Sequence, residues 1–193
     1  MRFALFVLCY LVLIIALINF FTIRTPRNKS MISKSVTVLL PVRNEQNNVG
    51  SCVAGLMAQK DVKQLQVIII NDQSTDNTAE VLSEAIGVDS RFTVIQSQGP
   101  REGWLGKVSA LQTGFERSTG EVIICLDADV RLAPDAIARS VNQLADLALD
   151  FISPYPRQLA GTFSEKLIQP LLHWSWMSTV ILRLAEKVPH RST

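Results

Sequence analysis

Two aspartates separated by one residue, Asp127 and Asp129, directly follow an apolar run at residues 122–126. The run is short and rich in β-branched residues, so it predicts a strand that is buried on both faces. Acids at the carboxyl end of such a strand lie where open α/β sheets bind ligands. Their oxygens suit a hard divalent cation, or the polyphosphate that such a cation carries. The alternative is a solvated loop with two incidental acids.

Polar segments follow three more predicted strands in the same way, at residues 41–45, 72–76 and 99–107. In a parallel sheet the carboxyl ends of the strands gather along one edge, so the four loops are expected to meet there. Together they offer an acid for a base or ribose, a cation for phosphate and an acid for a metal. These are the groups that a nucleoside diphosphate needs.

The third of these loops contains Gly103-Trp104-Leu105-Gly106-Lys107. The two glycines would let the backbone approach a phosphate closely, and Lys107 at a helix start adds its own charge to the positive end of the helix. The glycine spacing excludes both a Walker A loop and a dinucleotide-binding fingerprint. The alternative for Lys107 is a solvated charge, and Trp104 would either close over the site or pack its own loop.

The elements that must position these loops alternate regularly along the chain. Strands are predicted at 36–40, 65–70, 92–95 and 122–126, and helices at about 48–59, 76–86 and 107–117, with another beginning near Pro134. Pro41 is expected to stop the first strand, and the pattern allows a short fifth strand at 151–153. Strands that alternate with helices of this length predict right-handed βαβ crossovers, and hence an α/β fold with a mostly parallel sheet.

The amino terminus is almost wholly apolar from residue 3 to 23, with Asn19 as the only strongly polar interruption. About 20 helical residues span the roughly 30 Å hydrocarbon core of a bilayer. The run is too long for a cleaved signal peptide, so a transmembrane signal anchor is favoured. We interpret Asn19 as a tolerated polar residue near the interface, and a helix–helix contact is the alternative. The basic residues that follow predict a cytoplasmic location for the next domain: Arg24, Arg27, Lys29 and Lys34.

Residues 167–184 form a second apolar segment, which is aromatic and is interrupted by Pro170 and His173. Its length is marginal for a membrane span and closer to that of an interfacial or re-entrant helix, with Trp174 and Trp176 at headgroup depth. The alternative is a core helix of the globular domain.

The overall composition excludes several classes of protein. The chain has 193 residues, 48% of them hydrophobic, and a formal net charge of +2. This is a globular composition. The near-balanced charge gives no sign of nucleic-acid binding, and the sequence has no stripe of Lys and Arg interleaved with aromatic residues. Cys9, Cys52 and Cys125 are far apart, with no metal-ligand spacing and no disulfide framework. Their placement fits a reducing compartment.

The stretch from Val36 to Asp135 resembles glycosyltransferase family 2, whose members have the GT-A fold. Four motifs in order at strand ends carry the resemblance: Pro41-Val42-Arg43-Asn44-Glu45, Asn71-Asp72-Gln73-Ser74-Thr75-Asp76, Gly103 to Lys107, and Asp127-Ala128-Asp129. The Gly-Trp-x-Gly-Lys element, with an amino-terminal anchor, is most similar to the branch that acts on lipid acceptors, such as the hopanoid-associated and carotenoid-type enzymes. The resemblance implies an inverting transfer from a nucleotide sugar, with UDP as the expected nucleotide, to a membrane lipid at the inner (plasma) membrane.

The resemblance also implies roles for individual residues. The nucleotide would be bordered by Pro41, Arg43 and Glu45, and Asp72 would accept a hydrogen bond from the uracil ring nitrogen. The alternatives are a turn-forming role for Asp72 and a surface ion pair for Arg43. Asp76 has a stronger alternative, because it can simply cap the next helix.

The remaining implied roles concern the diphosphate. Lys107 would face it, Asp127 would contact the ribose, and Asp129 would bind Mg²⁺ or Mn²⁺ that bridges the two phosphates. The expected organisation is a single-pass anchor (1–23), a basic linker (24–34), a GT-A nucleotide-sugar-binding domain (35–160) and an apolar helical region (161–193).

One family feature has no counterpart in this sequence. The resemblance implies a general base within a Glu-Asp pair downstream of the Asp-x-Asp loop, but no Glu-Asp dipeptide is present. The Gln-x-x-Arg-Trp element of processive members is also missing. We therefore expect an amino-terminal piece of a longer enzyme, with the base beyond Thr193. The alternatives are a non-catalytic module that binds a nucleotide sugar, and a nucleotidyltransferase, although the Gly-rich first loop of that class is absent.

Overall fold

The computed structural model describes residues 2–185. The chain divides into two compact units, one of residues 26–154 and one that joins the residues up to 25 with those from 155 onward. We call the first the sheet unit and the second the helical unit. Most contacts lie within one unit or the other, so each unit is described separately.

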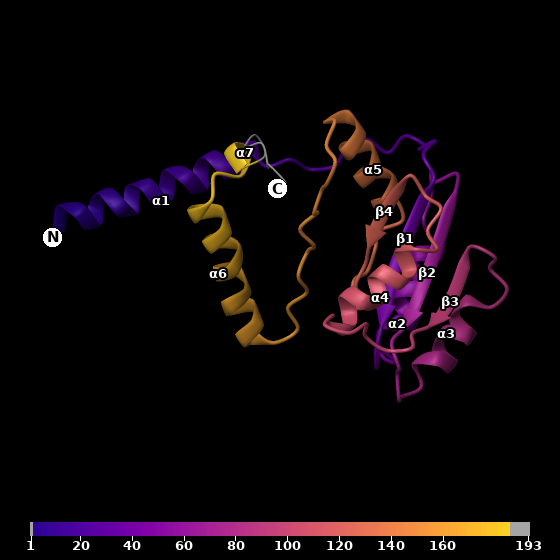
Figure 1. The fold of residues 1–193 in the computed structure, drawn as a ribbon. Helices are drawn as coiled ribbons and strands as arrows, with labels where there is room; N and C mark the ends of the chain where they lie inside the picture. The colour runs from indigo at the N-terminus through magenta and orange to yellow at the C-terminus, as the bar shows by residue number, and fades with distance from the viewer. Residues whose placement is uncertain (1, 186–193) are drawn as a thin grey trace. The chain divides into compact units, whose positions relative to one another are not determined.

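The sheet unit contains four parallel strands in the order β3-β2-β1-β4 (Figure 1). The strands are β1 (Val36–Val42), β2 (Leu65–Asn71), β3 (Phe92–Gln96) and β4 (Val122–Cys125). Every strand pair is parallel. This is possible because the connection before each new strand contains a helix, which returns the chain to the edge of the sheet at which the strands begin. The carboxyl ends of the four strands therefore share one edge, as the sequence predicts.

The helices of the sheet unit cover its two faces unequally. They are α2 (Val49–Met57), α3 (Thr78–Ile86), α4 (Gly106–Phe115) and α5 (Ala136–Asp146). Alternate residues of β1 and β2 pack with α2, α3 and α5 in the larger core, which includes Val38, Leu40 and Val53. The opposite face packs with α4 through Leu39 and Ile70. This alternation follows from the two-residue period of a strand.

Two expectations about the strands are wrong. Pro41 does not end β1, which continues to Val42 and pairs Pro41 with Ile70 of β2. The carbonyl of Leu39 bonds toward β4, so the missing N–H of Pro41 falls on the same side, where β4 has already ended. Residues 151–153 form no strand in the described structure.

The burial expected for the fourth strand is also wrong. β4 pairs only with β1 and forms an edge of the described sheet. Its first three residues are half-buried and Cys125 is exposed. An apolar run in a sequence shows that polar side chains are absent, but it does not show how many neighbouring strands pair with it.

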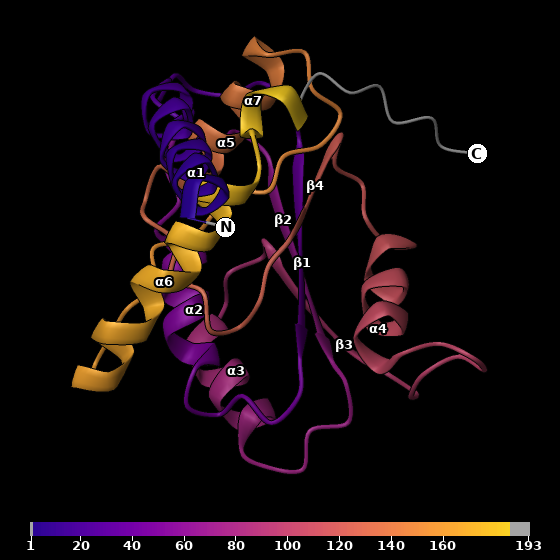
Figure 2. The same cartoon turned by 90° about the vertical axis from the view of Figure 1, so that its left-hand side faces the viewer.

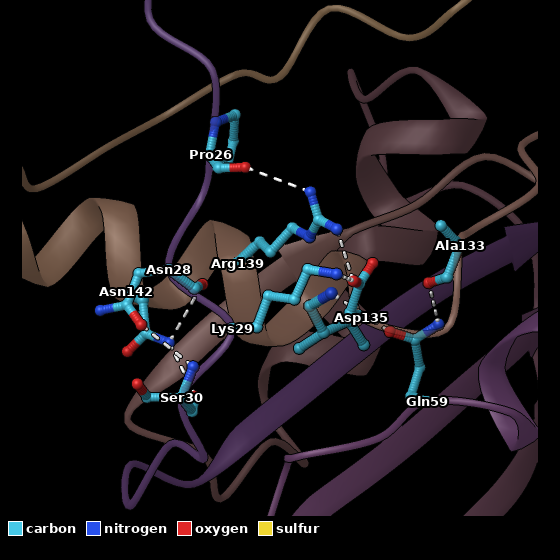
Figure 3. Close-up of polar contacts among 10 residues, drawn as sticks. Pro26, Asn28, Lys29, Ser30, Gln59, Ala133, Asp135, Arg139 and Asn142 are labelled. Carbon is cyan, nitrogen blue, oxygen red and sulfur yellow. Dashed lines mark hydrogen bonds and ion pairs between the residues drawn. The ribbon is translucent and has the colours of Figure 1, made fainter.

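The basic segment after the first helix is attached to the sheet unit from residue 26 onward (Figure 3). The amide of Asn142 in α5 donates to the carbonyl of Ser30 at 2.8 Å, and Lys29 pairs with Asp135 at 3.2 Å. Arg139 donates to the same carboxylate at 2.6 Å. Its guanidinium, with Lys29 as a second cause, holds the pKa of Asp135 below its usual value.

The helical unit consists of α1 (Arg2–Thr22), α6 (Phe163–Thr179) and α7 (Leu182–Ala185). α6 begins four residues earlier than the apolar segment expected at 167–184, because Thr162 and Glu165 form a capping box that fixes its first turn. The segment is also not one helix, since it breaks at residues 180–181 between α6 and α7. The large apolar side chains of α6 are exposed rather than packed in a core.

Candidate functional site

The loops at the carboxyl edge of the sheet surround one cavity of about 440 Å³. All seven residues expected at the site line this cavity: Pro41, Arg43, Glu45, Asp72, Lys107, Asp127 and Asp129. Gly106 and Ala110 at the start of α4 complete one wall. The structure therefore brings together side chains from four separate loops, while their chemical roles stay predictions.

Asp72 is the buried acid of the cavity, with a residue exposure of 5%. It directly follows β2, and its backbone N–H donates to the carbonyl of Val42 at 2.8 Å, which fixes its position. Its Oδ2 lies 4.0 Å from the guanidinium of Arg43. Its Oδ1 is buried and has no hydrogen-bond partner among the described residues. A buried acceptor without a partner is costly, so Asp72 is poised to accept from a ligand.

Gly106 also has a structural function, and the close approach to a phosphate expected of it stays a prediction. A Cβ at this position would lie 3.1 Å from Oδ2 of Asp72. The glycine therefore lets the amino end of α4 approach the buried carboxylate. Gly103 has a φ of +75° and open space around its Cα, so it is the backbone conformation of the loop that requires a glycine there.

The amino end of α4 is the positive part of the cavity. Its N-cap residue, Leu105, provides no side-chain hydrogen bond, so the first backbone N–H groups remain available. Lys107 adds a charge and pairs with Asp127 at 2.5 Å, with both side chains exposed. Trp104 lies against the guanidinium of Arg101, 5.8 Å from its ring centroid, and so packs within its own loop.

A hydrogen-bond network that the sequence did not reveal braces the Asp-x-Asp loop. Arg131 donates to the carbonyls of Ala128 at 2.9 Å and Val130 at 3.2 Å. It also donates to Oδ1 of Asn48 at 3.1 Å, and the amide of Asn48 donates to Glu45 at 2.9 Å. The loops after β1 and β4 are thus connected. The only signal in the sequence was an arginine two residues after Asp129, within reach of the loop carbonyls.

The loops after β1 and β2 are connected to each other as well. The backbone N–H of Asn44 donates to Ser74 at 3.0 Å, and its side chain accepts from the N–H of Thr75 at 2.8 Å. Asp76 accepts from the hydroxyl of Thr78 at 2.5 Å and from its N–H at 3.1 Å, in front of α3. The hydroxyl bond is the main cause of the lowered pKa of Asp76. This geometry favours a structural role for Asp76.

Cys52 lies behind the Asp-x-Asp loop as a neutral, buried thiol. Its Sγ is 3.9 Å from the carbonyl of Asp127. Burial is the largest cause that raises its pKa to about 11. The thiol therefore stays protonated near neutral pH and acts as a packing residue.

The donor set of the cavity fits a metal ion only in part. No cluster of three His, Cys, Asp or Glu side chains that could hold a metal is found among residues 2–185. Asp127 is engaged by Lys107, which leaves the exposed carboxylate of Asp129 as a hard oxygen ligand. Such a site fits a cation that takes most of its ligands from a diphosphate and water, as Mg²⁺ commonly does. It does not fit an all-protein cage.

Comparison with known proteins gives a family match and several relatives. The sequence model of the family described as "Glycosyl transferase family 2" matches residues 37–190. An undecaprenyl-phosphate 4-deoxy-4-formamido-L-arabinose transferase of Pectobacterium atrosepticum is 34% identical over 111 residues, 56% of this chain and 33% of that protein. A protein of the same name from Pseudomonas fluorescens is 33% identical over 57% of this chain and 32% of its own length. The chain thus spans about a third of these relatives.

A solved structure shows the same fold. The mannosyltransferase PcManGT from Pyrobaculum calidifontis, determined in complex with GDP-Man and Mn²⁺, superposes with a TM-score of 0.57. The two sequences are 22% identical, and the match covers 72% of this chain and 41% of the other. Together with the parallel sheet and its flanking helices, this similarity confirms the expected GT-A-type α/β class.

Proposed function

Because the chain belongs to glycosyl transferase family 2, we propose that it carries the donor-binding part of an inverting glycosyltransferase that moves a sugar from a nucleotide sugar to a membrane lipid. The observation that carries the proposal is the convergence of a buried acid, a helix amino terminus with a lysine, and an exposed acid in one cavity. These groups match the base, the diphosphate and the metal of such a donor.

The nucleotide is the first part of the proposal. The buried Oδ1 of Asp72 has no partner among the described residues, and a uracil ring offers an N–H donor that would satisfy it. Arg43, which is exposed beside Asp72, and Glu45 on the adjoining loop would border the base and ribose. This arrangement supports UDP as the nucleotide.

The diphosphate is the second part. The amino end of α4 and Lys107 would bind it, since backbone N–H groups and a helix dipole favour anions. Lys107 would then exchange part of its contact with Asp127 for phosphate oxygens, which frees Asp127 for the ribose hydroxyls. The carboxylate of Asp129 would hold Mg²⁺ or Mn²⁺. When bound, the ion supplies positive charge that stabilises the departing nucleoside diphosphate.

The acceptor oxygen displaces the diphosphate at the anomeric carbon, which inverts the configuration. A hydroxyl acceptor would need a general base, and no residue of that role is identified in this chain. The names of the relatives favour a different acceptor, a polyprenyl phosphate. A phosphate monoester is largely ionised at pH 7, so its oxygen could attack without prior removal of a proton. The missing Glu-Asp pair would then be no obstacle to this reaction.

The membrane is part of the proposal, because the acceptor is a lipid. Within residues 2–185, α1 is the one helix that is long and apolar enough to cross a bilayer. We propose that it anchors the chain and that the basic residues after it keep the sheet unit on the cytoplasmic side.

Calorimetric titration of UDP into the purified chain, with and without Mn²⁺, tests the donor site. We expect Mn²⁺ to strengthen UDP binding and Asp129→Ala to remove that enhancement. Asp150→Asn is the matched control, because Asp150 is an exposed acid that does not line the cavity. Metal-independent UDP binding in the unaltered chain would show that the proposed role of Asp129 is wrong.

The second candidate function is a non-catalytic module that binds a nucleotide sugar, and the absence of an identified base favours it if the acceptor is a hydroxyl. Incubation of the chain with radiolabelled UDP-sugar and membrane lipid, beside a longer form of the protein, separates the two. Label transferred by the chain itself supports the enzyme. Tight UDP–Mn²⁺ binding without transfer by either form supports the module.

A further inference from the structure

Asn19 of α1 is fully buried, although α1 otherwise exposes apolar side chains along its length. Its amide donates to the carbonyl of Met177 at 2.8 Å and to that of Val180 at 2.5 Å. Its Oδ1 accepts from the N–H of Leu182 at 3.0 Å. One side chain thus satisfies three backbone groups where α6 ends and α7 begins. The interpretation of Asn19 as a merely tolerated polar residue is therefore wrong.

The contact between α1 and α6 is local. On α1, the half-buried positions Val12, Ile15 and Ala16 form one helical stripe with the buried Asn19. On α6, the buried position is Ser178, near the carboxyl end. The rest of α6 exposes large apolar side chains, each at least half exposed: Phe163, Leu167, Ile168, Leu171, Leu172, Trp174 and Trp176. No described protein segment covers this surface, which we call the α6 apolar face.

α6 has the pattern of an interfacial helix. Lys166, Gln169 and His173 recur at spacings of three and four residues, so they form one narrow polar stripe. Between its first and last turns the remaining circumference is apolar and includes two tryptophans, a residue type that favours the level of the lipid headgroups. Toward the carboxyl end, the hydroxyls of Ser175, Ser178 and Thr179 donate to backbone carbonyls of α6 itself. At 17 residues α6 is about 26 Å long, shorter than a typical span.

The position of Asn19 along α1 sets the depth in the bilayer at which α1 contacts α6. Asn19 lies three residues before the end of α1, which ends at Thr22. If α1 crosses the bilayer, the carboxyl end of α6 is held near the surface at which α1 leaves it. The chain also reaches the start of α6 from that same surface, because no helix of residues 26–154 is long enough to cross back. Both ends of α6 therefore belong to one surface of the bilayer.

The arrangement of the helices agrees with this reasoning. Figure 1 shows that α6 meets α1 near the carboxyl end of α1 and runs across its axis rather than along it. In Figure 2, where α1 is seen nearly end-on, α6 extends to the side of it. A helix that crosses the axis of a membrane-spanning helix lies roughly in the membrane plane.

We propose that α6 lies in the headgroup region of the leaflet where α1 ends, with the α6 apolar face in contact with lipid, and that Asn19 holds it there. The inference rests on the membrane anchor of the proposed function. It replaces a single-span anchor by a span joined to an in-plane helix. Asn19 is fully buried, so water does not compete for its three hydrogen bonds even at the level of the headgroups.

Tryptophan fluorescence in bilayers containing brominated lipids measures the depth of α6. The chain has three tryptophans, so Trp104→Phe with Trp176→Phe leaves Trp174 as the single reporter. A second variant places the reporter at the middle of α6, by Leu171→Trp with all three native tryptophans changed to Phe. Each variant is reconstituted with lipid brominated near the headgroup or near the chain ends. Flotation with the vesicles reports the anchor independently.

We expect both reporters to be quenched more by shallow bromines than by deep ones. Stronger quenching of the middle reporter by deep bromines would indicate a spanning helix and overturn the proposal. Absence of quenching in chains that float with the vesicles would indicate a helix covered by protein, and would also overturn it. Chains that do not float would instead contradict the anchor of the proposed function.

Hydrogen exchange tests Asn19 directly. Asn19→Leu removes the acceptor of the Leu182 N–H, so we expect exchange at this amide to accelerate about tenfold in the reconstituted chain. Ile18→Leu is the matched control, since Ile18 is an exposed neighbour on the same helix, and it should leave the exchange rate unchanged. Equal exchange in the Asn19→Leu variant and the control would show that Asn19 does not hold α6.

Discussion

Asp72 and Asp127 are both acids of the cavity, yet their surroundings give them different chemistry. Asp72 is buried beside an exposed arginine at 4.0 Å, so a buried hydrogen-bond acceptor remains without a partner. Asp127 is exposed and already paired with Lys107. A ligand therefore gains a new hydrogen bond at Asp72 but must compete with an existing ion pair at Asp127. We therefore expect a hydrogen-bond donor to bind at Asp72 without displacing an existing contact, whereas a ligand at Lys107 and Asp127 must displace their ion pair.

Arg131 is the residue whose loss should loosen the Asp-x-Asp loop without removing any residue that lines the cavity. We expect Arg131→Ala to weaken UDP–Mn²⁺ binding by about 1 kcal/mol, a factor of about five, because the carbonyls of Ala128 and Val130 lose their donor. Arg131→Lys should give an intermediate value, since one ammonium cannot reproduce the planar guanidinium. Titration calorimetry measures both, with Arg117→Ala as a control for a lost surface charge. Unchanged affinity in Arg131→Ala would contradict the bracing role.

At the scale of elements, the close contact between α4 and the sheet depends on a glycine. A Cβ on Gly114 would lie 2.7 Å from Cδ1 of Ile70 and 3.2 Å from Cδ2 of Leu39. A larger residue would force Ile70, Leu39 or α4 itself to move. Because α4 also carries Gly106 and Lys107, this packing sets where the helix amino terminus stands in the cavity.

Gly114→Ala should lower the free energy of unfolding by about 1–3 kcal/mol, since overpacking outweighs the gain in helix propensity. Gly50→Ala is the matched comparison in α2. Its Cβ would meet only Cγ1 of Val81 at 3.4 Å, so the propensity gain of up to about 1 kcal/mol should remain. Urea denaturation measures both. A Gly114→Ala variant as stable as the unaltered chain would show that α4 can shift at little cost.

At the scale of the whole molecule, the side of the membrane on which the sheet unit lies decides which substrates it can reach. A nucleotide-sugar donor is a cytoplasmic metabolite, so the proposed function requires the sheet unit on that side. Cys125 is an exposed thiol of the sheet unit, whereas Cys52 is buried. Cys125 is therefore a natural reporter of topology.

We expect a membrane-impermeant maleimide to label Cys125 in inverted membrane vesicles but not in intact spheroplasts. Partial desolvation of the exposed thiol, with the charge of Asp127 as a second cause, raises the pKa of Cys125, so the reaction should be slow at neutral pH and faster in mildly alkaline buffer. Cys125→Ser identifies the labelled site, because the signal should disappear in that variant. Labelling of Cys125 in spheroplasts would place the sheet unit outside and contradict the proposed topology.

Much of this molecule follows from its sequence. The two-residue and 3.6-residue periods predict the strands and helices, and the rule that parallel strands end at one edge predicts that Pro41, Asp72, Lys107 and Asp129 gather there. These are local patterns joined by one general rule of topology, so no knowledge of particular contacts was needed. The chemical roles of these residues stay predictions.

Other features were decided only by the tertiary structure. The continuation of β1 through Pro41 depends on where β4 ends, and the edge position of β4 depends on its pairing with β1 alone. Arg131 connects two loops because it donates a hydrogen bond to Asn48, 83 positions away. Asn19 connects two helices because it accepts one from Leu182, 163 positions away. The type of a residue and its near neighbours in the sequence determine its propensity for helix or strand. Its hydrogen-bond partners depend on how distant segments pack together.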